Sequence, residues 1–169
     1  MAILEIKKYP EKVLMEKAAS VPEIDRDIQR LIDDMIETMY AAPGIGLAAP
    51  QVGVSKRIIV IDVSVKEGEK TPLIVLINPE IISTEGEIDS EEGCLSLPGY
   101  ITTVKRAERV VVKGLNRDGE EIKIEGEGLL SRALQHEIDH LNGILLIDRI
   151  SRIKREFFKK RYKKALARV

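Results

Sequence analysis

Residues 136–140 read His-Glu-Ile-Asp-His, and they contain the only two histidines among 169 residues. On a helix, residues four positions apart lie one above the other on the same face. Two imidazoles at this spacing can bind one metal ion, and Glu137 then stands beside the ion as a candidate general base. The alternative for such a pair is two solvated histidines on a helix surface.

The sequence around this stretch predicts a helix from about residue 129 to residue 142, and Gly143 follows where a glycine commonly ends a helix. Apolar residues at helical spacing form one stripe that must pack against other elements, namely Leu130, Leu134, Ile138 and Leu141. A neighbouring face carries Leu129, Ala133, His136 and His140. We therefore expect the histidines at the edge of the core, facing a cleft, which disfavours the surface alternative.

Apolar spacing and turn residues predict further elements on both sides of this helix. Residues 25–41 have the spacing of a helix, and residues 57–63 and 73–82 have the composition of buried strands. Residues 108–125 alternate and fold back at Asn116-Arg-Asp-Gly119, which predicts a hairpin. A last helix is expected over residues 151–166.

This order of elements predicts an α+β fold, in which mixed or antiparallel sheets pack around a central HExxH helix. An N-terminal helix and a basic C-terminal helix complete it. The length predicts a single domain over residues 1–169, with residues 151–169 forming the C-terminal helix.

Composition excludes several classes of protein. Hydrophobic residues make up 44% and charged residues 33% of the chain, and no apolar run is long enough to span a bilayer. The N-terminus has no basic and apolar leader, so we expect a cytoplasmic protein without a membrane partner. A single cysteine excludes an internal disulfide and a zinc cluster built from several cysteines.

Charge is distributed unevenly along the chain. Residues 152–169 carry nine Lys and Arg and one Glu, although the net charge of the whole chain is only −1. One interpretation is a solvated basic helix whose Ile153, Phe157 and Tyr162 pack on the core. The other is a surface that binds RNA phosphates.

A catalytic metal site commonly has three protein ligands and one open position, so a third ligand is needed. Leu146 occupies the position where one class of HExxH enzymes has a third histidine. Glu156, the only later glutamate, lies among basic and aromatic residues and is a poor candidate. The remaining soft ligand is Cys94, in Glu92-Gly-Cys-Leu-Ser-Leu-Pro-Gly99, which we expect to form a tight loop. The alternative for a lone cysteine is a small packing residue.

Residues 44–49 read Gly-Ile-Gly-Leu-Ala-Ala and superficially match the dinucleotide-binding pattern. The context does not fit, because they follow a predicted helix rather than a strand, so we expect no nucleotide cofactor. Small residues here would let the backbone of a ligand approach closely, and Gln51 can both donate and accept hydrogen bonds.

Three segments together, GIGLAAPQ at 44–51, EGCLS at 92–96 and QHEIDH at 135–140, resemble the peptide deformylases. The resemblance implies a hydrolase that removes the N-formyl group from the N-terminal formyl-methionine of nascent polypeptides. It implies Cys94, His136 and His140 as ligands of one divalent metal ion, usually Fe(II), which zinc, nickel or cobalt can replace. Glu137 would be the acid/base, and Gln51 and the Leu95 N–H would stabilise the oxyanion. Ile101 departs from family members that have an arginine near the substrate entrance.

For the substrate, we expect Ile45 and Leu129 to wall the methionine side chain and the peptide to dock as a strand along residues 44–46, with Gly46 in contact. The basic tail would bind ribosomal RNA, as in related deformylases.

Two other functions stay open. One is a non-catalytic RNA-binding protein with a structural metal, which the presence of Glu137 disfavours. The other is a zinc peptidase that cleaves whole peptide bonds.

Overall fold

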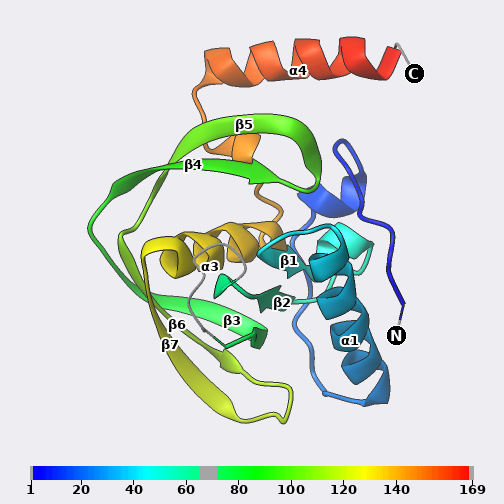
Figure 1. Cartoon of the computed structure of the whole chain (residues 1–169), viewed down its shortest axis with the longest axis vertical. Coiled ribbons are helices and arrows are strands. Elements are labelled where there is room, and N and C mark those ends of the chain that lie inside the picture. Colours follow the sequence, from blue (N-terminus) through cyan, green and yellow to red (C-terminus); the bar gives the residue numbers. More distant parts are fainter. Residues whose placement is uncertain (1, 65–71, 168–169) are drawn as a thin grey trace.

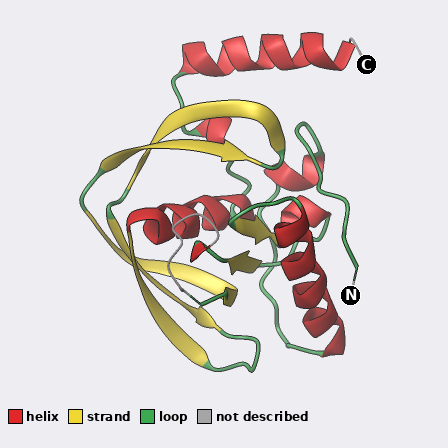
Figure 2. Cartoon of the chain, in the orientation of Figure 1, coloured by secondary structure: helices red, strands yellow, loops and turns green. Residues whose placement is uncertain are grey.

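The computed structural model describes residues 2–64 and 72–167. Its framework is a five-stranded sheet with the strand order β1-β2-β3-β6-β7, in which every neighbouring pair is antiparallel. Its strands are β1 (Gly46–Ala48), β2 (Ile58–Ile61), β3 (Ile74–Glu85), β6 (Arg109–Leu115) and β7 (Glu121–Glu127). A separate antiparallel hairpin consists of β4 (Ile88–Cys94) and β5 (Leu97–Arg106). Figure 2 shows these strands in yellow.

Helix α3 (Gly128–Leu141) lies between the five-stranded sheet and the β4–β5 hairpin (Figure 1). Helix α1 (Arg26–Ala41) packs beside β1 and β2, and α4 (Arg152–Ala167) lies beyond β5 at one end of the molecule. Short 3-10 segments connect these elements at η1 (Lys12–Met15), η2 (Ala49–Val52) and η3 (Leu146–Asp148).

The apolar stripe of α3 holds the helix against the sheet. Leu134, Ile138 and Leu141 are buried in one cluster with side chains from the central strands, among them Ile59, Ile61, Leu76, Val110 and Val112. Strand β7 comes close to the start of this helix at Gly126, where a Cβ would lie 2.9 Å from Leu134 Cδ1 and 3.3 Å from the backbone of Ser131. The sheet therefore fixes both the depth and the rotation of α3.

Most of the predicted elements are confirmed. The α+β class is correct, and the pairs within both sheets are antiparallel rather than mixed. Helix α1 begins after Asp25, whose side chain accepts a hydrogen bond from the Ile28 N–H at 2.9 Å. The predicted hairpin is β6–β7, and the Asn116 side chain accepts from the N–H groups of Asp118 and Glu120 in its turn.

Three expectations need correction. Residues 92–99 do not form a loop, because β4 pairs with β5 up to Cys94–Leu97, and the chain reverses within residues 95–96. Strand β3 is buried only in its first half, since residues 80–85 are exposed where the strand runs past the core. On α4, Ile153 and Phe157 are 71% and 65% exposed, and Phe158 packs on the core in their place.

The ring of Phe158 lies against Tyr9 and Tyr100, with centroids 5.5 and 4.6 Å apart. Tyr162 packs against the same cluster, as expected, with its ring centroid 5.5 Å from that of Phe158, so only Ile153 and Phe157 of the predicted face are wrong. Within residues 2–64 and 72–167, no helix is both long and apolar enough to cross a membrane.

Truncating Leu134, which is fully buried, should destabilise the protein because α3 would lose its deepest contact with the sheet. We expect Leu134→Ala to lower the free energy of unfolding by about 2–5 kcal/mol in chemical denaturation. Ile153→Ala, on the exposed face of α4, is the control and should change it by less than about 0.5 kcal/mol. Equal effects of the two substitutions would contradict the central place of α3 in the core.

Candidate active site

Three donor atoms from two elements meet above the sheet. His136 and His140 lie on consecutive turns of α3, with ring centroids 5.0 Å apart. Cys94 ends β4, and its sulfur lies 3.3 Å from His140 Nε2. The sulfur and one nitrogen of each histidine all lie within 4.8 Å of one another. This arrangement brings together the three ligands that the sequence predicts.

The chemistry of this donor set fits a metal ion. A thiolate and two imidazoles are ligands that Zn²⁺ and Fe(II) accept, and three protein ligands leave a position open. Burial opposes ionisation of the Cys94 thiol, but the charge of His140 and the hydrogen bond with His136 outweigh burial and lower the thiol pKa well below its ordinary value. The thiolate form, which binds metals, is therefore favoured here.

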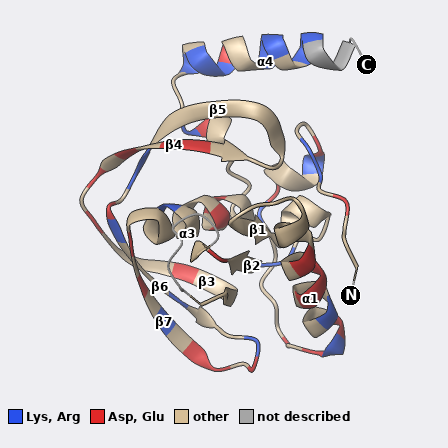
Figure 3. Ribbon diagram, viewed as in Figure 1, with Lys and Arg blue, Asp and Glu red and all other residues tan. Residues whose placement is uncertain are grey.

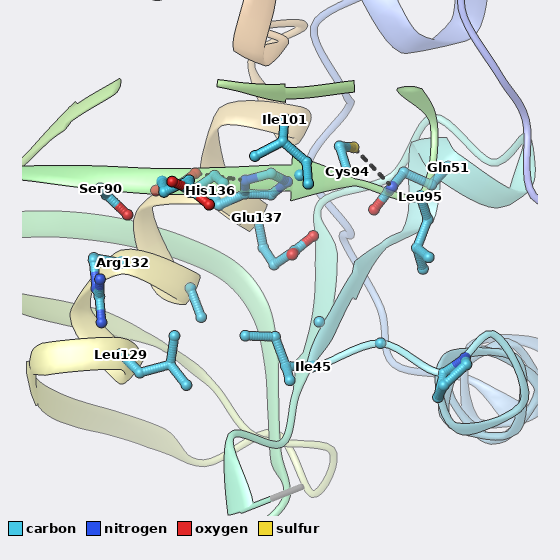
Figure 4. Close-up of a pocket in the computed structure, with 17 residues that line it drawn as sticks. Ile45, Gln51, Ser90, Cys94, Leu95, Ile101, Leu129, Arg132, His136 and Glu137 are labelled. Carbon is cyan, nitrogen blue, oxygen red and sulfur yellow. Dashed lines mark hydrogen bonds and ion pairs between the residues drawn. The ribbon is translucent and has the colours of Figure 1, made fainter. Parts of the chain in front are cut away.

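The carboxyl group of Glu137 lies beside these ligands, and the residue is only 5% exposed. Burial raises its pKa, whereas the two neighbouring histidines lower it, and the net shift is upward. Its Oε1 has no hydrogen-bond partner in the described structure. Figure 4 shows the side chain directed into the pocket from α3. A buried carboxyl oxygen without a partner can take up a proton from a bound molecule.

Gln51, in η2, is held from both ends. Its Oε1 accepts from the Ala48 N–H at 3.0 Å, and its Nε2 lies 3.2 Å from Ser96 Oγ and 3.7 Å from Cys94 Sγ. The amide N–H group thus faces the candidate metal ligands, as the dashed line in Figure 4 indicates. Because the carbonyl is occupied by Ala48, the side chain cannot flip without losing that bond.

A cavity of about 520 Å³ opens in front of these groups. Its lining includes every residue that the sequence analysis singled out for the site except His140, namely Ile45, Gly46, Gln51, Cys94, Leu95, Leu129, His136 and Glu137. His140 is 2% exposed and lies behind the lining, where its Nε2 contacts the Cys94 sulfur. Ile101, the position that departs from the family pattern, is 66% exposed and also lines the cavity.

At Gly46, β1 comes close to the Glu137 side chain of α3. A Cβ at this position would lie 2.5 Å from Glu137 Oε2 and 2.9 Å from Glu137 Cδ. The lack of a side chain therefore leaves the room that the Glu137 carboxyl group occupies. A peptide contact at Gly46 is expected from the sequence, and the close approach of Glu137 is a second reason why a residue without a side chain is needed here.

Sequence reasoning missed the charged groups behind the ligands. His136 Nδ1 lies 2.9 Å from Glu92 Oε1. Arg106 on β5 forms ion pairs with Glu92 and with Asp139 at 2.7 Å each. Asp139 also pairs at 2.6 Å with Arg149, whose side chain is more exposed to solvent than that of Arg106. Burial raises the pKa of Glu92, but hydrogen bonds from His136 and Arg106 outweigh it and lower the pKa to about 2. Glu92 stood in the quoted EGCLS segment, whereas no sequence signal connects Arg106 to it.

Arg132 on α3 also lines the cavity and was not predicted. Its guanidinium donates to the Gly128 carbonyl of its own helix at 3.3 Å. The cavity thus has an apolar wall from Leu129 and Ile45 and a cationic group near its edge (Figure 4).

Comparison with known proteins agrees with this geometry. The family model described as polypeptide deformylase matches residues 3–156. The chain belongs to the polypeptide deformylase family. It is therefore an enzyme, a metal-dependent hydrolase that removes the N-formyl group from nascent peptides.

Individual relatives are similar over nearly the whole chain. A peptide deformylase of Thermodesulfovibrio yellowstonii is 69% identical over 163 residues, which cover 96% of this chain and 98% of the relative. The crystal structure of a peptide deformylase from Legionella pneumophila superposes with a TM-score of 0.88 at 49% identity, covering 99% of each chain. The Ehrlichia chaffeensis enzyme in complex with actinonin superposes with a TM-score of 0.90 at 42% identity, covering 98% of each chain.

Adding a methyl group at Gly46 tests the contact with Glu137. Gly46→Ala should lower kcat by at least about 10-fold, because the new Cβ would displace the carboxyl group of Glu137, the candidate general base. Gly44→Ala is the comparison, since its Cβ would have a single tight contact, at 3.1 Å with Cδ1 of the Leu95 side chain, and it should lower kcat less. Steady-state formate release measures both. A kcat unchanged by Gly46→Ala would contradict the role assigned to the contact.

Proposed function

We propose that Cys94, His136 and His140 bind one divalent metal ion and that the deformylation reaction takes place in the cavity beside them. The observation that carries this proposal is the meeting of three donor atoms within 4.8 Å of one another next to a buried, unpartnered carboxyl oxygen of Glu137. A closed structural site would have no use for such a group, which disfavours a non-catalytic RNA-binding protein.

When bound, the ion supplies Lewis-acid chemistry that polarises a carbonyl group and lowers the pKa of water. Fe(II) is the proposed physiological metal, with zinc, nickel or cobalt as substitutes, because a thiolate and two imidazoles accept all of them. This part of the proposal rests on the resemblance to the family, since the ligand set alone does not select one metal.

Glu137 is the proposed acid/base. Its carboxylate would accept the proton of the attacking water and then return it to the departing amine, which gives formate and a free N-terminus. Negative charge would develop on the formyl oxygen during the attack. The Gln51 amide, fixed by its bond to Ala48, and the backbone N–H of Leu95 are the proposed donors to this oxygen.

The proposed substrate position follows from the edge of the sheet. β1 is the outermost strand of the five-stranded sheet, and residues 43–46 line the cavity beside it. An extended peptide can add to an open strand edge through main-chain hydrogen bonds. Ile45 and Leu129 would then wall the methionine side chain, with Gly46 below the peptide backbone. A formyl group is the smallest acyl group, so a narrow site would exclude acetyl groups by size.

Beyond the reaction itself, we propose a cytoplasmic enzyme, folded as one domain over residues 1–169, that works at the ribosome. Figure 3 shows Lys and Arg along α4, while α1 carries many acidic residues. Lys159, Lys160, Lys163 and Lys164 are all exposed. Such a surface would bind the phosphates of ribosomal RNA near the place where the substrate emerges.

Glu137→Gln separates chemistry from metal binding, because the amide keeps the size of the side chain but cannot take up a proton. It should retain the metal and lower kcat for formyl-Met-Ala by about 100- to 10,000-fold. Formate release and metal content measure the two effects. Full activity in the variant would contradict the acid/base role. Unformylated Met-Ala is the control substrate, and its cleavage at a comparable rate would favour a general peptidase.

Removing charge from α4 tests ribosome binding without removing Phe158 from the core. Lys159→Gln combined with Lys160→Gln and Lys163→Gln should weaken binding to ribosomes and reduce its dependence on salt concentration. The matched control replaces three exposed basic residues on the sheet, Arg109, Lys113 and Lys123, with Gln. Co-sedimentation at low salt measures both. Equal binding of the two triple variants would contradict docking through α4.

A further inference from the structure

A single buried arginine connects the two elements that carry the candidate metal ligands. Arg106 stands at the end of β5, and its side chain is 2% exposed. Its Nε and one terminal nitrogen donate to the two oxygens of Glu92 at 2.9 and 2.7 Å. Its other terminal nitrogen donates to Asp139 Oδ2 at 2.7 Å. All three guanidinium nitrogens therefore donate to carboxylates whose side chains are only 10% and 11% exposed.

Each of these carboxylates adjoins a candidate ligand. Glu92 lies on β4 two residues before Cys94, and its Oε1 is 2.9 Å from His136 Nδ1. Asp139 directly precedes His140 on α3. Hydrogen bonds from Arg106 thus join the strand that carries the sulfur to the helix that carries both imidazoles.

We propose that Arg106 is a positioning residue for the metal site: it fixes Cys94 relative to His136 and His140 by holding Glu92 and Asp139 together. Through Glu92 it also orients the ring of His136, because a carboxylate at Nδ1 keeps the proton on that nitrogen and leaves Nε2 as the metal ligand. This inference deepens the proposed function and rests on it.

Stability alone is a weak explanation for this arrangement. Moving charged groups out of water is costly, and buried ion pairs are often replaced by apolar side chains without loss of stability. The planar guanidinium offers what an apolar group cannot, namely donors at fixed angles toward two different carboxylates. A lysine would keep the charge, but its single nitrogen cannot reproduce the two-oxygen contact with Glu92.

Arg149 provides a matched comparison. Its guanidinium also makes two hydrogen bonds to a single carboxylate, at 2.9 and 2.6 Å to the oxygens of Asp139. Its side chain is 42% exposed, and its described hydrogen bonds do not include Glu92 or either histidine. Replacing Arg149 therefore weakens the same ion-pair network without breaking the connection between β4 and α3.

The test compares Arg106→Lys with Arg149→Lys in the full-length chain loaded with Co²⁺. Competition with a chelator gives the dissociation constant for Co²⁺, and the absorption spectrum reports the geometry of the cobalt–thiolate site. Arg106→Lys should raise the dissociation constant by about 10- to 100-fold and shift the spectrum, as changes behind metal ligands commonly do. Arg149→Lys should leave both at the wild-type values while lowering Tm slightly.

Two results would overturn the role of Arg106. One is an Arg106→Lys protein of lowered Tm whose Co²⁺ dissociation constant and spectrum match the wild type. The other is equal weakening by Arg149→Lys. If Arg106→Lys does not fold, Asp139→Asn, which removes the charge from only one arm, replaces it and should still bind Co²⁺ more weakly than Arg149→Lys. Failure of the wild-type protein to form a cobalt–thiolate spectrum would instead overturn the proposed metal site itself.

Discussion

Helix α3 is packed between the apolar face of the five-stranded sheet and charged side chains of the β4–β5 hairpin, and the active site depends on that packing. Its apolar stripe lies against the five-stranded sheet, with Leu134 and Leu141 fully buried. Its polar face meets the β4–β5 hairpin through Glu92, Arg106 and Asp139. Because side chains four residues apart share one face of a helix, this packing brings both histidines to the end of β4, where Cys94 lies.

Residues 44–51, the GIGLAAPQ segment, supply the opposite side of the cavity. Residues 46–48 form an edge strand in register with β2, which brings Gly46 under the Glu137 carboxyl group. The next turn, η2, then places Gln51 against Ala48 and Ser96. Three segments distant in sequence therefore meet around one small volume, and each contributes a different kind of group: a backbone edge, a thiol and a pair of imidazoles.

Local patterns were sufficient to predict α1, α3 and the β6–β7 hairpin, and the histidine spacing together with the single cysteine predicted the three donor atoms that meet in the structure. Local patterns failed for β4 and β5, because Glu91, Glu92 and the threonines of β5 lack the alternation of apolar and polar residues that identifies a half-buried strand. Phe158 was missed in favour of Phe157 because, in a mostly basic segment, the sequence does not indicate which of two adjacent phenylalanines faces the core. The contact of Arg106 with Glu92 and Asp139 joins residues 14 and 33 positions apart, so only tertiary structure reveals it.

The central claim is that one sulfur and two imidazole nitrogens of this chain bind the same metal ion. X-ray absorption spectroscopy of protein purified without air tests it most directly, because the fine structure at the metal edge reports the type and distance of each ligand. The account predicts one sulfur at about 2.3 Å and two imidazole nitrogens at about 2.0–2.1 Å if the ion is zinc. A metal shell made only of nitrogen and oxygen would contradict it.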